Sequence, residues 1–412
     1  MDNGGGKSNN NDKEFHLLSI KKQIEELYVP KFESGFERPA SPSDYESYLS
    51  NCDQSFDKLY SVTTNLIICQ GASDKLKQKC ISSAFILCGE HSFFNLWTTE
   101  VSIKLGKLIL EKLIKELGYL NVIDALTLSN SIVLSNILKD LRPKLLKDSW
   151  KCFGAAVACY SWVLQIVESP HLAEHLNSVL PTALILVDDF VSENRTLGLK
   201  SLEHIINNVA RTHLCWFAQD EVILKALEPL VFFKEEDLIE PSISVLMSLM
   251  RKKYPQVINS ELQMNDFDPL INTILHNMML EQRIKIRNAY VKMLPVIIRA
   301  RGLGMLLHSI ALLKVIDEYV LEPTSSIEGL EVLKCFMEVC WPRIHAHFDH
   351  IFLLICKIYL GIDHNRYTGF CVEKVLKEVV EMLQKLCPQK IEERRNEFLK
   401  YQCFPGLQSI FS

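Results

Sequence analysis

One stretch decides the fold of this chain, and it reads LPTALILVDDFVSENRTLGLKSLEHII from Leu180 to Ile206. Apolar residues recur in it at intervals of three and four, which places them along one face of a helix. The first stripe contains Leu180, Leu184, Val187 and Val191, and the second contains Leu199, Leu202, Ile206 and Val209. The spacing therefore predicts two helices joined by a short turn.

A pair of helices with one apolar stripe each cannot bury both stripes alone, so it requires stacked copies. Asp189 lies next to the predicted turn, and Arg195 lies near the start of the second helix. The stretch resembles a HEAT repeat, a family in which an Asp and an Arg at these places commonly bond to neighbouring repeats. This pattern favours a scaffold over an enzyme.

Weak copies of the pattern follow. Pro181 precedes Asp189 by eight residues, and Pro229 precedes Asp237 by the same interval. Pro269 is followed at the two corresponding offsets by Asn277 and Arg283. The three prolines are 48 and 40 residues apart, close to the 40–47 residue period of HEAT and armadillo repeats. We expect an all-α, HEAT/armadillo-like α-solenoid with irregular repeats, although an irregular helical domain could also produce three weak matches.

The composition agrees with an all-α chain. Hydrophobic residues make up 48% of the 412 residues, and the 16 Gly and 15 Pro are too few for a turn-rich all-β protein. The net charge is −5, and the basic clusters, such as Arg251–Lys253 and Arg394–Arg395, are short. Nucleic acid is therefore not an expected partner.

The cysteines and the apolar runs indicate the compartment. Thirteen cysteines, none in CxxC spacing, sit mostly in apolar helical stretches such as those of Cys69, Cys88, Cys159 and Cys356, which favours free thiols in a reducing compartment. The amino-terminal residues lack an apolar signal region. The longest nearly uncharged apolar run, from Gly154 to Val167, is shorter than the ~20 residues that span a bilayer. We expect a soluble intracellular protein with no membrane partner.

Four regions are predicted. Residues 1–44 form a disordered tail with one short amphipathic helix and a linker, in which Phe15, Leu18, Ile24 and Leu27 lie on or near one side and Phe32–Asp44 is the linker. The helix acts either as a cap on the solenoid or as a peptide for a partner. Residues 45–170 form an N-terminal helical region with degenerate repeats, residues 171–401 the HEAT-like repeats, and residues 402–412 a tail.

Candidate chemical motifs all have simpler explanations. Gly6-Lys7-Ser8 lacks the earlier glycine and the strand of a phosphate-binding loop, and Gly302-Leu303-Gly304 is predicted to be a turn between helices. The cluster of His345, His347, Asp349 and His350 is predicted to be a polar helix face, because three imidazoles on one helix do not converge on a metal. Neither a catalytic site nor a cofactor is expected. Ser41, followed by Pro42, is a candidate phosphorylation site.

Three segments resemble a known family, Tti-two (Tel-two-interacting protein two), a subunit of the TTT co-chaperone complex. They are Leu186–Asn194 continuing to Ile205, then Arg287–Pro295 followed by Gly302, and Cys340–Ile344. The match covers roughly residues 170–360 and does not extend to residues 1–150. At residues 188–194 and 341–343 the matching residues are candidates for partner binding: Asp188, Glu193, Asn194, Trp341, Pro342 and Arg343.

The resemblance implies a protein without enzymatic activity that binds a larger HEAT scaffold, Tti-one, alongside Tel-two. The complex works with the ninety-kilodalton heat-shock chaperone and RuvB-like ATPases. It supports the maturation of phosphatidylinositol-3-kinase-related kinases, which act in the DNA damage response among other pathways. The expected location is the cytoplasm and nucleus. The alternatives are a karyopherin-like or phosphatase-scaffold HEAT adaptor and, resting only on the His345 cluster, a helical metalloenzyme.

The motif Trp341-Pro342-Arg343 is expected at a corner between helices, because proline removes a helix hydrogen bond and is tolerated only in the first turn. Trp341 would close one helix and Pro342 would start the next. At such a corner the indole either fills the core between repeats or stays exposed as an anchor for the scaffold partner.

Overall fold

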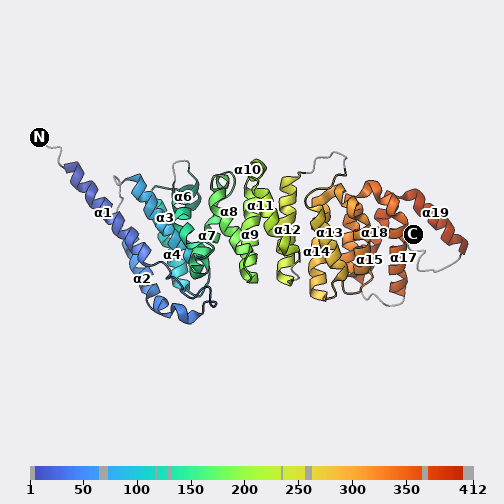
Figure 1. Cartoon of the computed structure of the whole chain (residues 1–412), viewed down its shortest axis with the longest axis horizontal. Helices are drawn as coiled ribbons and strands as arrows, with labels where there is room; N and C mark the ends of the chain where they lie inside the picture. The colour runs from blue at the N-terminus through green and yellow to red at the C-terminus, as the bar shows by residue number, and fades with distance from the viewer. Residues whose placement is uncertain are drawn as a thin grey trace. The chain divides into compact units, whose positions relative to one another are not determined.

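The computed structural model describes residues 5–64, 73–116, 118–128, 132–232, 235–255, 262–363 and 370–401. Within these ranges all regular secondary structure is helical (Figure 1). The helices fall into two compact units: unit 1 contains Met1–Asp189 and Asn208–Ala210, and unit 2 contains Phe190–Asn207 and Arg211–Ser412. The predicted tail at 402–412 lies outside the described residues, as does Cys69.

The helices of unit 1 are α1 (Gly5–Glu26), η1 (Pro42–Tyr45), α2 (Glu46–Thr64), α3 (Asp74–Glu90), α4 (Glu100–Glu116), α5 (Val122–Thr127), α6 (Val133–Leu141), η2 (Arg142–Lys144), η3 (Trp150–Cys152), α7 (Gly154–Ile166), η4 (His171–His175) and α8 (Leu176–Val187). The helix α3 is the centre of this unit, since it packs against α1, α4, α6 and α7. Every residue from Cys80 to Glu90 is buried as a result.

The helices of unit 2 are α9 (Ser192–Asn208), α10 (Arg211–Trp216), α11 (Gln219–Leu227), η5 (Glu228–Phe232), α12 (Glu236–Lys253), α13 (Asp268–Leu280), α14 (Ile284–Arg301), η6 (Gly302–His308), α15 (Ser309–Val320), α16 (Ser326–Val339), η7 (Trp341–Arg343), α17 (Ile344–Asp363), α18 (Phe370–Leu386) and α19 (Pro388–Tyr401). Helices two apart in this order pack on each other: α12 on α14, α14 on α16, α16 on α18, and α13 on α15.

Side-chain contacts in unit 2 join similar positions of successive helices. The Cys335 thiol of α16 lies 3.8 Å from the Pro295 carbonyl of α14, 40 residues away. Lys334 of α16 donates to Glu378 of α18 over 2.6 Å, 44 residues away. Between α13 and α15, the Asp268–His308 and Met278–Tyr319 contacts lie near opposite ends of the helices and join residues 40 and 41 apart. Alternate helices are therefore parallel and nearly in register, with the separation expected of a HEAT or armadillo repeat. The predicted all-α, HEAT-like solenoid fold is confirmed.

The deciding stretch of sequence forms α8 and α9. All four residues of its second stripe are fully buried. In the first stripe Leu180 and Val187 are buried, whereas Leu184 and Val191 are only half-buried. The buried face of α8 is wider than predicted and also includes Leu176, Val179, Ala183 and Leu186.

The amino-terminal helix uses a different face from the one predicted. The buried side chains of α1 are Leu17, Ile20 and Ile24, whereas Phe15 is 76% exposed and Leu18 is 51% exposed. The prediction was wrong for Phe15 and Leu18. The face with Leu17, Ile20 and Ile24 is buried in unit 1, where α1 packs against α3. The helix begins at Gly5, so it includes Gly6-Lys7-Ser8, within the region predicted to be a disordered tail.

The segment Phe32–Asp44, predicted to be a linker, packs against unit 1. The Phe32 amide donates to the Cys152 carbonyl over 2.9 Å. A Cβ atom at Gly35 would lie 2.2 Å from the Lys151 carbonyl oxygen, so only glycine fits this contact. Ser41 directly precedes η1, and its hydroxyl donates to the Asp44 carboxylate over 2.8 Å. The linker interpretation was therefore wrong, and the predicted phosphorylation of Ser41 stays a prediction.

The three prolines used to predict the repeats do not occupy equivalent positions. Pro181 lies inside α8, Pro229 lies in η5, and Pro269 lies in the first turn of α13. Asp237 is exposed at the start of α12, whereas Asp189 is buried after α8. Although the period was close to correct, the proline spacing does not mark its register.

Among the described residues, one helical stretch, Ile284–Val320, is long enough to cross a membrane and contains an 18-residue window apolar enough to do so, with a mean hydropathy of 1.6. It is not one straight helix, because Gly302 ends α14 with a φ of 61° and η6 separates α14 from α15. Since 56% of its most apolar part is buried, its apolar side chains act as core of unit 2. Nine of the ten cysteines whose side chains the structure describes are buried free thiols, in agreement with their predicted role as small core residues.

Candidate interaction site

A buried charge network fixes the turn between α14 and α15. Asp268, at the start of α13, is fully buried and accepts hydrogen bonds from Arg301 Nε over 2.8 Å and from Arg301 Nη2 over 3.1 Å. His308 Nε2 lies 2.8 Å from the same carboxylate, and His308 Nδ1 lies 2.7 Å from Asn272 Oδ1. Burial raises the pKa of Asp268, but the bonds from Arg301 and His308 outweigh it, so the pKa lies below its usual value.

The glycines predicted to form a turn are required by this network. Gly302 has a positive φ, which glycine adopts without strain. A Cβ atom at Gly304 would lie 2.0 Å from Arg301 Nη1, so a side chain there would displace the guanidinium. The network therefore holds both ends of η6, through Arg301 directly before it and His308 at its end.

Apolar side chains are exposed along the edge of unit 2 where α14 and α16 end. Because these two helices pack in parallel, η6 and η7 lie on the same edge. The exposed fractions are 44% for Leu303, 41% for Leu307, 72% for Ile310 and 62% for Trp341. We call these four residues the η6–η7 edge. Exposed apolar residues gathered in this way are typical of surfaces that bind another protein.

Trp341 is at a helix corner, as predicted. The helix α16 ends at Val339, η7 spans Trp341–Arg343 with Pro342 in its first turn, and α17 begins at Ile344. Cys340, next to the tryptophan, is fully buried and anchors the corner. Because the indole itself is exposed, it does not fill the core between repeats. The interpretation of the indole as a core plug is therefore wrong, and its role as an anchor for a partner stays a prediction.

The other predicted partner-binding residues lie near the junction of α8 and α9. Asp188 is exposed, 3.6 Å from Lys147 within unit 1. In unit 2, Glu193 is exposed in the first turn of α9, and Asn194 is half-buried. Asp188 belongs to unit 1, and Glu193 and Asn194 belong to α9. None of the three belongs to the η6–η7 edge as defined above.

The predicted repeat residues Asp189 and Arg195 are both buried and form ion pairs. Asp189 accepts from Lys151 over 2.6 Å within unit 1. Arg195 lies 3.4 Å from Glu235, 40 residues away in unit 2. Each ion pair joins the α8–α9 segment to a residue outside it, and the role of Asp189 and Arg195 as repeat residues stays a prediction.

Two members of the histidine cluster on α17, Asp349 and His350, pair with other side chains. Asp349 accepts from Arg394 over 2.6 Å, and His350 lies 3.0 Å from Asp317. His345 is exposed and His347 half-buried. No group of three potential metal ligands occurs among the described residues.

Sequence reasoning missed the buried charges of unit 2. Besides Asp268 and Arg301, the nearly buried Asp220 lies 3.2 Å from Lys253, which also donates to Asp266 over 2.9 Å. Asp268 stands directly before Pro269, a residue that the repeat pattern did single out. An Asp before a helix-starting proline, with an Arg in the last turn of the next helix, was the available signal.

Comparison with known proteins gives curated relatives but no family model, since none matches the chain. The chain is 30% identical over 312 residues to human TELO2-interacting protein 2, which covers 73% of this chain and 61% of the relative. The rat protein of the same name is 28% identical over 257 residues, covering 60% of this chain and 50% of the relative. The chain thus spans about half to three-fifths of the length of these relatives.

Among solved structures, the karyopherin Kap121p bound to RanGTP has a TM-score of 0.50 to this chain. The two are 11% identical, and the match covers 90% of this chain and 34% of the karyopherin. At this identity the likeness concerns the fold alone, a solenoid of paired helices.

Proposed function

Because the chain belongs to the family of TELO2-interacting protein 2, we propose that it is a non-catalytic scaffold subunit of a TTT-type complex. In this function it binds a Tti-one-like HEAT scaffold and a Tel-two-like protein. Through them it acts with the heat-shock chaperone and RuvB-like ATPases in the maturation of phosphatidylinositol-3-kinase-related kinases. The cytoplasm and the nucleus are the corresponding locations.

The sequence identity to TELO2-interacting protein 2 over 73% of the chain carries this proposal. The structure supports it in two ways. The solenoid presents long helical surfaces suited to protein partners. The η6–η7 edge exposes apolar side chains, including a tryptophan, and tryptophan is among the residues that most often dominate binding energy at protein interfaces. We place the contact with the Tti-one-like scaffold at this edge.

The function is tested by affinity purification of the tagged endogenous protein. Recovery of a large HEAT protein and a Tel-two-like protein, with the kinases in smaller amounts, is the expected result. Recovery of transport cargo or of a phosphatase catalytic subunit in their place would assign the chain to the karyopherin-like or phosphatase-scaffold class instead.

Trp341→Ala is expected to weaken binding of the Tti-one-like partner by about 2 kcal/mol, or about thirtyfold, as for a hot-spot residue. Since the indole is exposed in the isolated chain, the melting temperature should stay within about 1 °C of the unchanged protein. Both quantities are measured on purified protein, by titration with the partner and by a thermal melt.

The matched control is Phe232→Ala. Phe232 is 64% exposed, close to the 62% of Trp341. It precedes the N-terminal end of α12, whereas the η6–η7 edge follows the C-terminal ends of the parallel helices α14 and α16. This variant should bind the partner normally. Equal losses in both variants, or no loss for Trp341→Ala, would remove the η6–η7 edge as the interface while leaving the family membership unaffected.

A further inference from the structure

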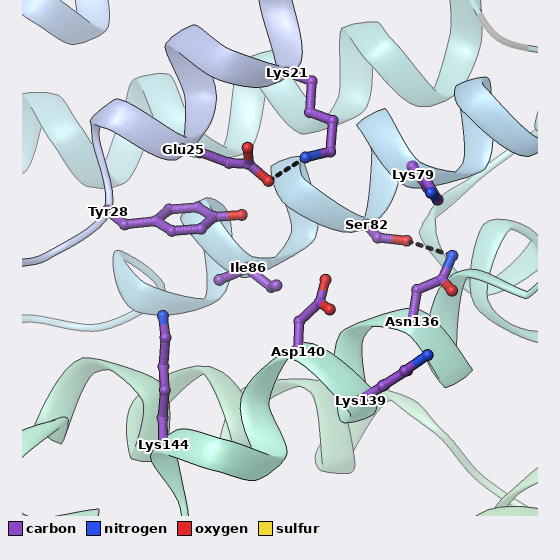
Figure 2. Close-up of a pocket in the computed structure, with 10 residues that line it drawn as sticks. All are labelled: Lys21, Glu25, Tyr28, Lys79, Ser82, Ile86, Asn136, Lys139, Asp140 and Lys144. Carbon is purple, nitrogen blue, oxygen red and sulfur yellow. Dashed lines mark hydrogen bonds and ion pairs between the residues drawn. The ribbon is translucent and has the colours of Figure 1, made fainter. Parts of the chain in front are cut away.

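Unit 1 contains a half-open cavity of about 560 Å³ between α1, α3, α6 and η2 (Figure 2). Its volume is within the range of ligand-binding pockets. Four lysines line it: Lys21 from α1, Lys79 from α3, Lys139 from α6 and Lys144 from η2. None of them belongs to the surface proposed above, which lies in unit 2.

The cavity is positively charged although the whole chain carries a net charge of −5. Two carboxylates, Glu25 and Asp140, accompany the four ammonium groups, so the lining has a formal charge of +2. Glu25 is already paired with Lys21. Lys144 lies 3.9 Å from the buried Glu90 and 5.1 Å from the centre of the Tyr28 ring.

Two lysines remain for a ligand. Within the described residues, no ion pair involves Lys79 or Lys139, which are both exposed at the mouth of the cavity. Between them Asn136 donates to Ser82 Oγ over 3.5 Å, as Figure 2 shows. The cavity therefore combines two available cations with neutral hydrogen-bonding groups.

The remaining wall is apolar. Ile86 and the Tyr28 ring line the side near Lys144, and the Tyr28 hydroxyl donates to the Ser83 carbonyl over 3.1 Å. A small inorganic anion would leave this wall uncovered. A peptide can place a charged group between the lysines and its own carbon atoms against Ile86 and Tyr28.

We propose that this cavity binds a phosphorylated serine or threonine in an acidic peptide segment of another protein. A phosphate monoester carries a charge of about −1.5 to −2 and three strong acceptor oxygens. Lysine binds such a group as a flexible point charge. Lys79 and Lys139 bind the phosphate, and Asp140, which lies between Lys139 and Lys144, opposes every anion that enters.

The proposal is tested by fluorescence polarisation on the full chain. The probe is a labelled peptide with one phosphoserine flanked by glutamates, compared with the same peptide carrying serine. The phosphopeptide should bind more tightly. The double substitution Lys79→Ala and Lys139→Ala should weaken phosphopeptide binding about tenfold, since two partly exposed ion pairs between lysine and phosphate are lost. Asp140→Asn should strengthen it several-fold, because a repelling charge is removed.

The control removes two other exposed lysines, Lys200 and Lys225 of unit 2, by the double substitution Lys200→Ala and Lys225→Ala. It changes the net charge equally but leaves the cavity intact, so it should bind the phosphopeptide normally. Thermal melts establish that all variants are folded.

Three results would overturn the proposal. The first is equal affinity for the two peptides, and the second is an equal loss in the two double-lysine variants. In the third, inositol hexakisphosphate binds the cavity more tightly than the phosphopeptide, which would assign it to a small free anion. Each result leaves the proposed scaffold function standing, because that function rests on other residues and another assay.

Discussion

Arg301→Ala is expected to lower the free energy of unfolding of unit 2 by about 3–5 kcal/mol, the usual effect of removing one partner of a buried ion pair. Asp268 has no exposed surface, and Arg301 supplies two of the hydrogen bonds to its carboxylate. Without the guanidinium, the negative charge of Asp268 would stay buried with only His308 Nε2 and the Asn265 amide bonded to it. The quantity is measured by denaturant unfolding, with hydrogen exchange of α13 and α15 to locate the change.

Arg394→Ala is the control for Arg301→Ala. Arg394 also pairs with an aspartate, Asp349, over 2.6 Å, but that carboxylate is 66% exposed. Arg394→Ala should therefore lower the free energy of unfolding by less than about 1 kcal/mol. A double variant with Arg301→Ala and Asp268→Ala should be more stable than Arg301→Ala alone, because no unpaired charge remains. Equal effects for the two arginines would mean that Asp268 is not held in a buried site.

The same network has a definite pH dependence. The pKa of Asp268 is lower in the folded chain than in the unfolded one. Its contribution to stability is therefore present above the unfolded pKa of about 3.8 and is lost as the pH falls below it. In Arg301→Ala the folded pKa rises, so this loss should begin at a higher pH.

The helix pair α8–α9 was predictable because its information is local. A stripe such as Leu199, Leu202, Ile206 and Val209 is present in the sequence itself, and all four residues are fully buried. The face of α1 was not predictable in the same way. Phe15 and Leu18 fit a helical spacing as well as Leu17, Ile20 and Ile24 do, and the choice depends on how α1 packs against α3, about 60 residues away.

The contacts that hold the candidate site in place join residues far apart in the sequence, so a local sequence pattern does not predict them. Asp268 and Arg301 are 33 residues apart and meet only when α13 and α14 pack. The segment 32–44 has the composition of a linker, yet its order comes from contacts with residues 151 and 152. For Trp341 the sequence predicted the corner but left open whether the indole was buried, because that depends on how much of the corner the neighbouring helices cover.

Two adjacent buried groups in unit 1 titrate in opposite directions. Glu90 and His91, at the end of α3, are each 1% exposed. Burial raises the pKa of Glu90 to about 7, although Lys144 and a hydrogen bond from the Val29 amide oppose this. Burial lowers the pKa of His91 to about 4. His91 is held between Ser102 at 2.9 Å and the Tyr48 hydroxyl at 3.0 Å.

The signs of the two contributions follow from linkage. Glu90 contributes stability that is fully present below its unfolded pKa of about 4.5 and is lost as the pH rises to about 7. His91 contributes stability that is present above its unfolded pKa of about 6.5 and is lost as the pH falls to about 4. Each group changes the free energy of unfolding by about 3 kcal/mol over its range, since one pKa unit corresponds to about 1.36 kcal/mol. Between pH 4.5 and 6.5 the two slopes largely cancel.

Glu90→Gln should therefore stabilise unit 1 by about 3 kcal/mol at pH 8 and have little effect near pH 4. The amide oxygen of glutamine can still accept from Val29, so the gain comes from removing a buried charge. The variant should also expose the contribution of His91, with stability that rises from pH 4 to 6.5 and then stays level. Denaturant unfolding across this pH range measures both effects.

The control is Glu111→Gln, at an exposed ion pair with Lys107, which should change neither the stability at pH 8 nor the pH profile. If the stability of Glu90→Gln and that of the unchanged protein vary with pH in the same way from pH 5 to 8, then Glu90 is solvated and the end of α3 is not buried.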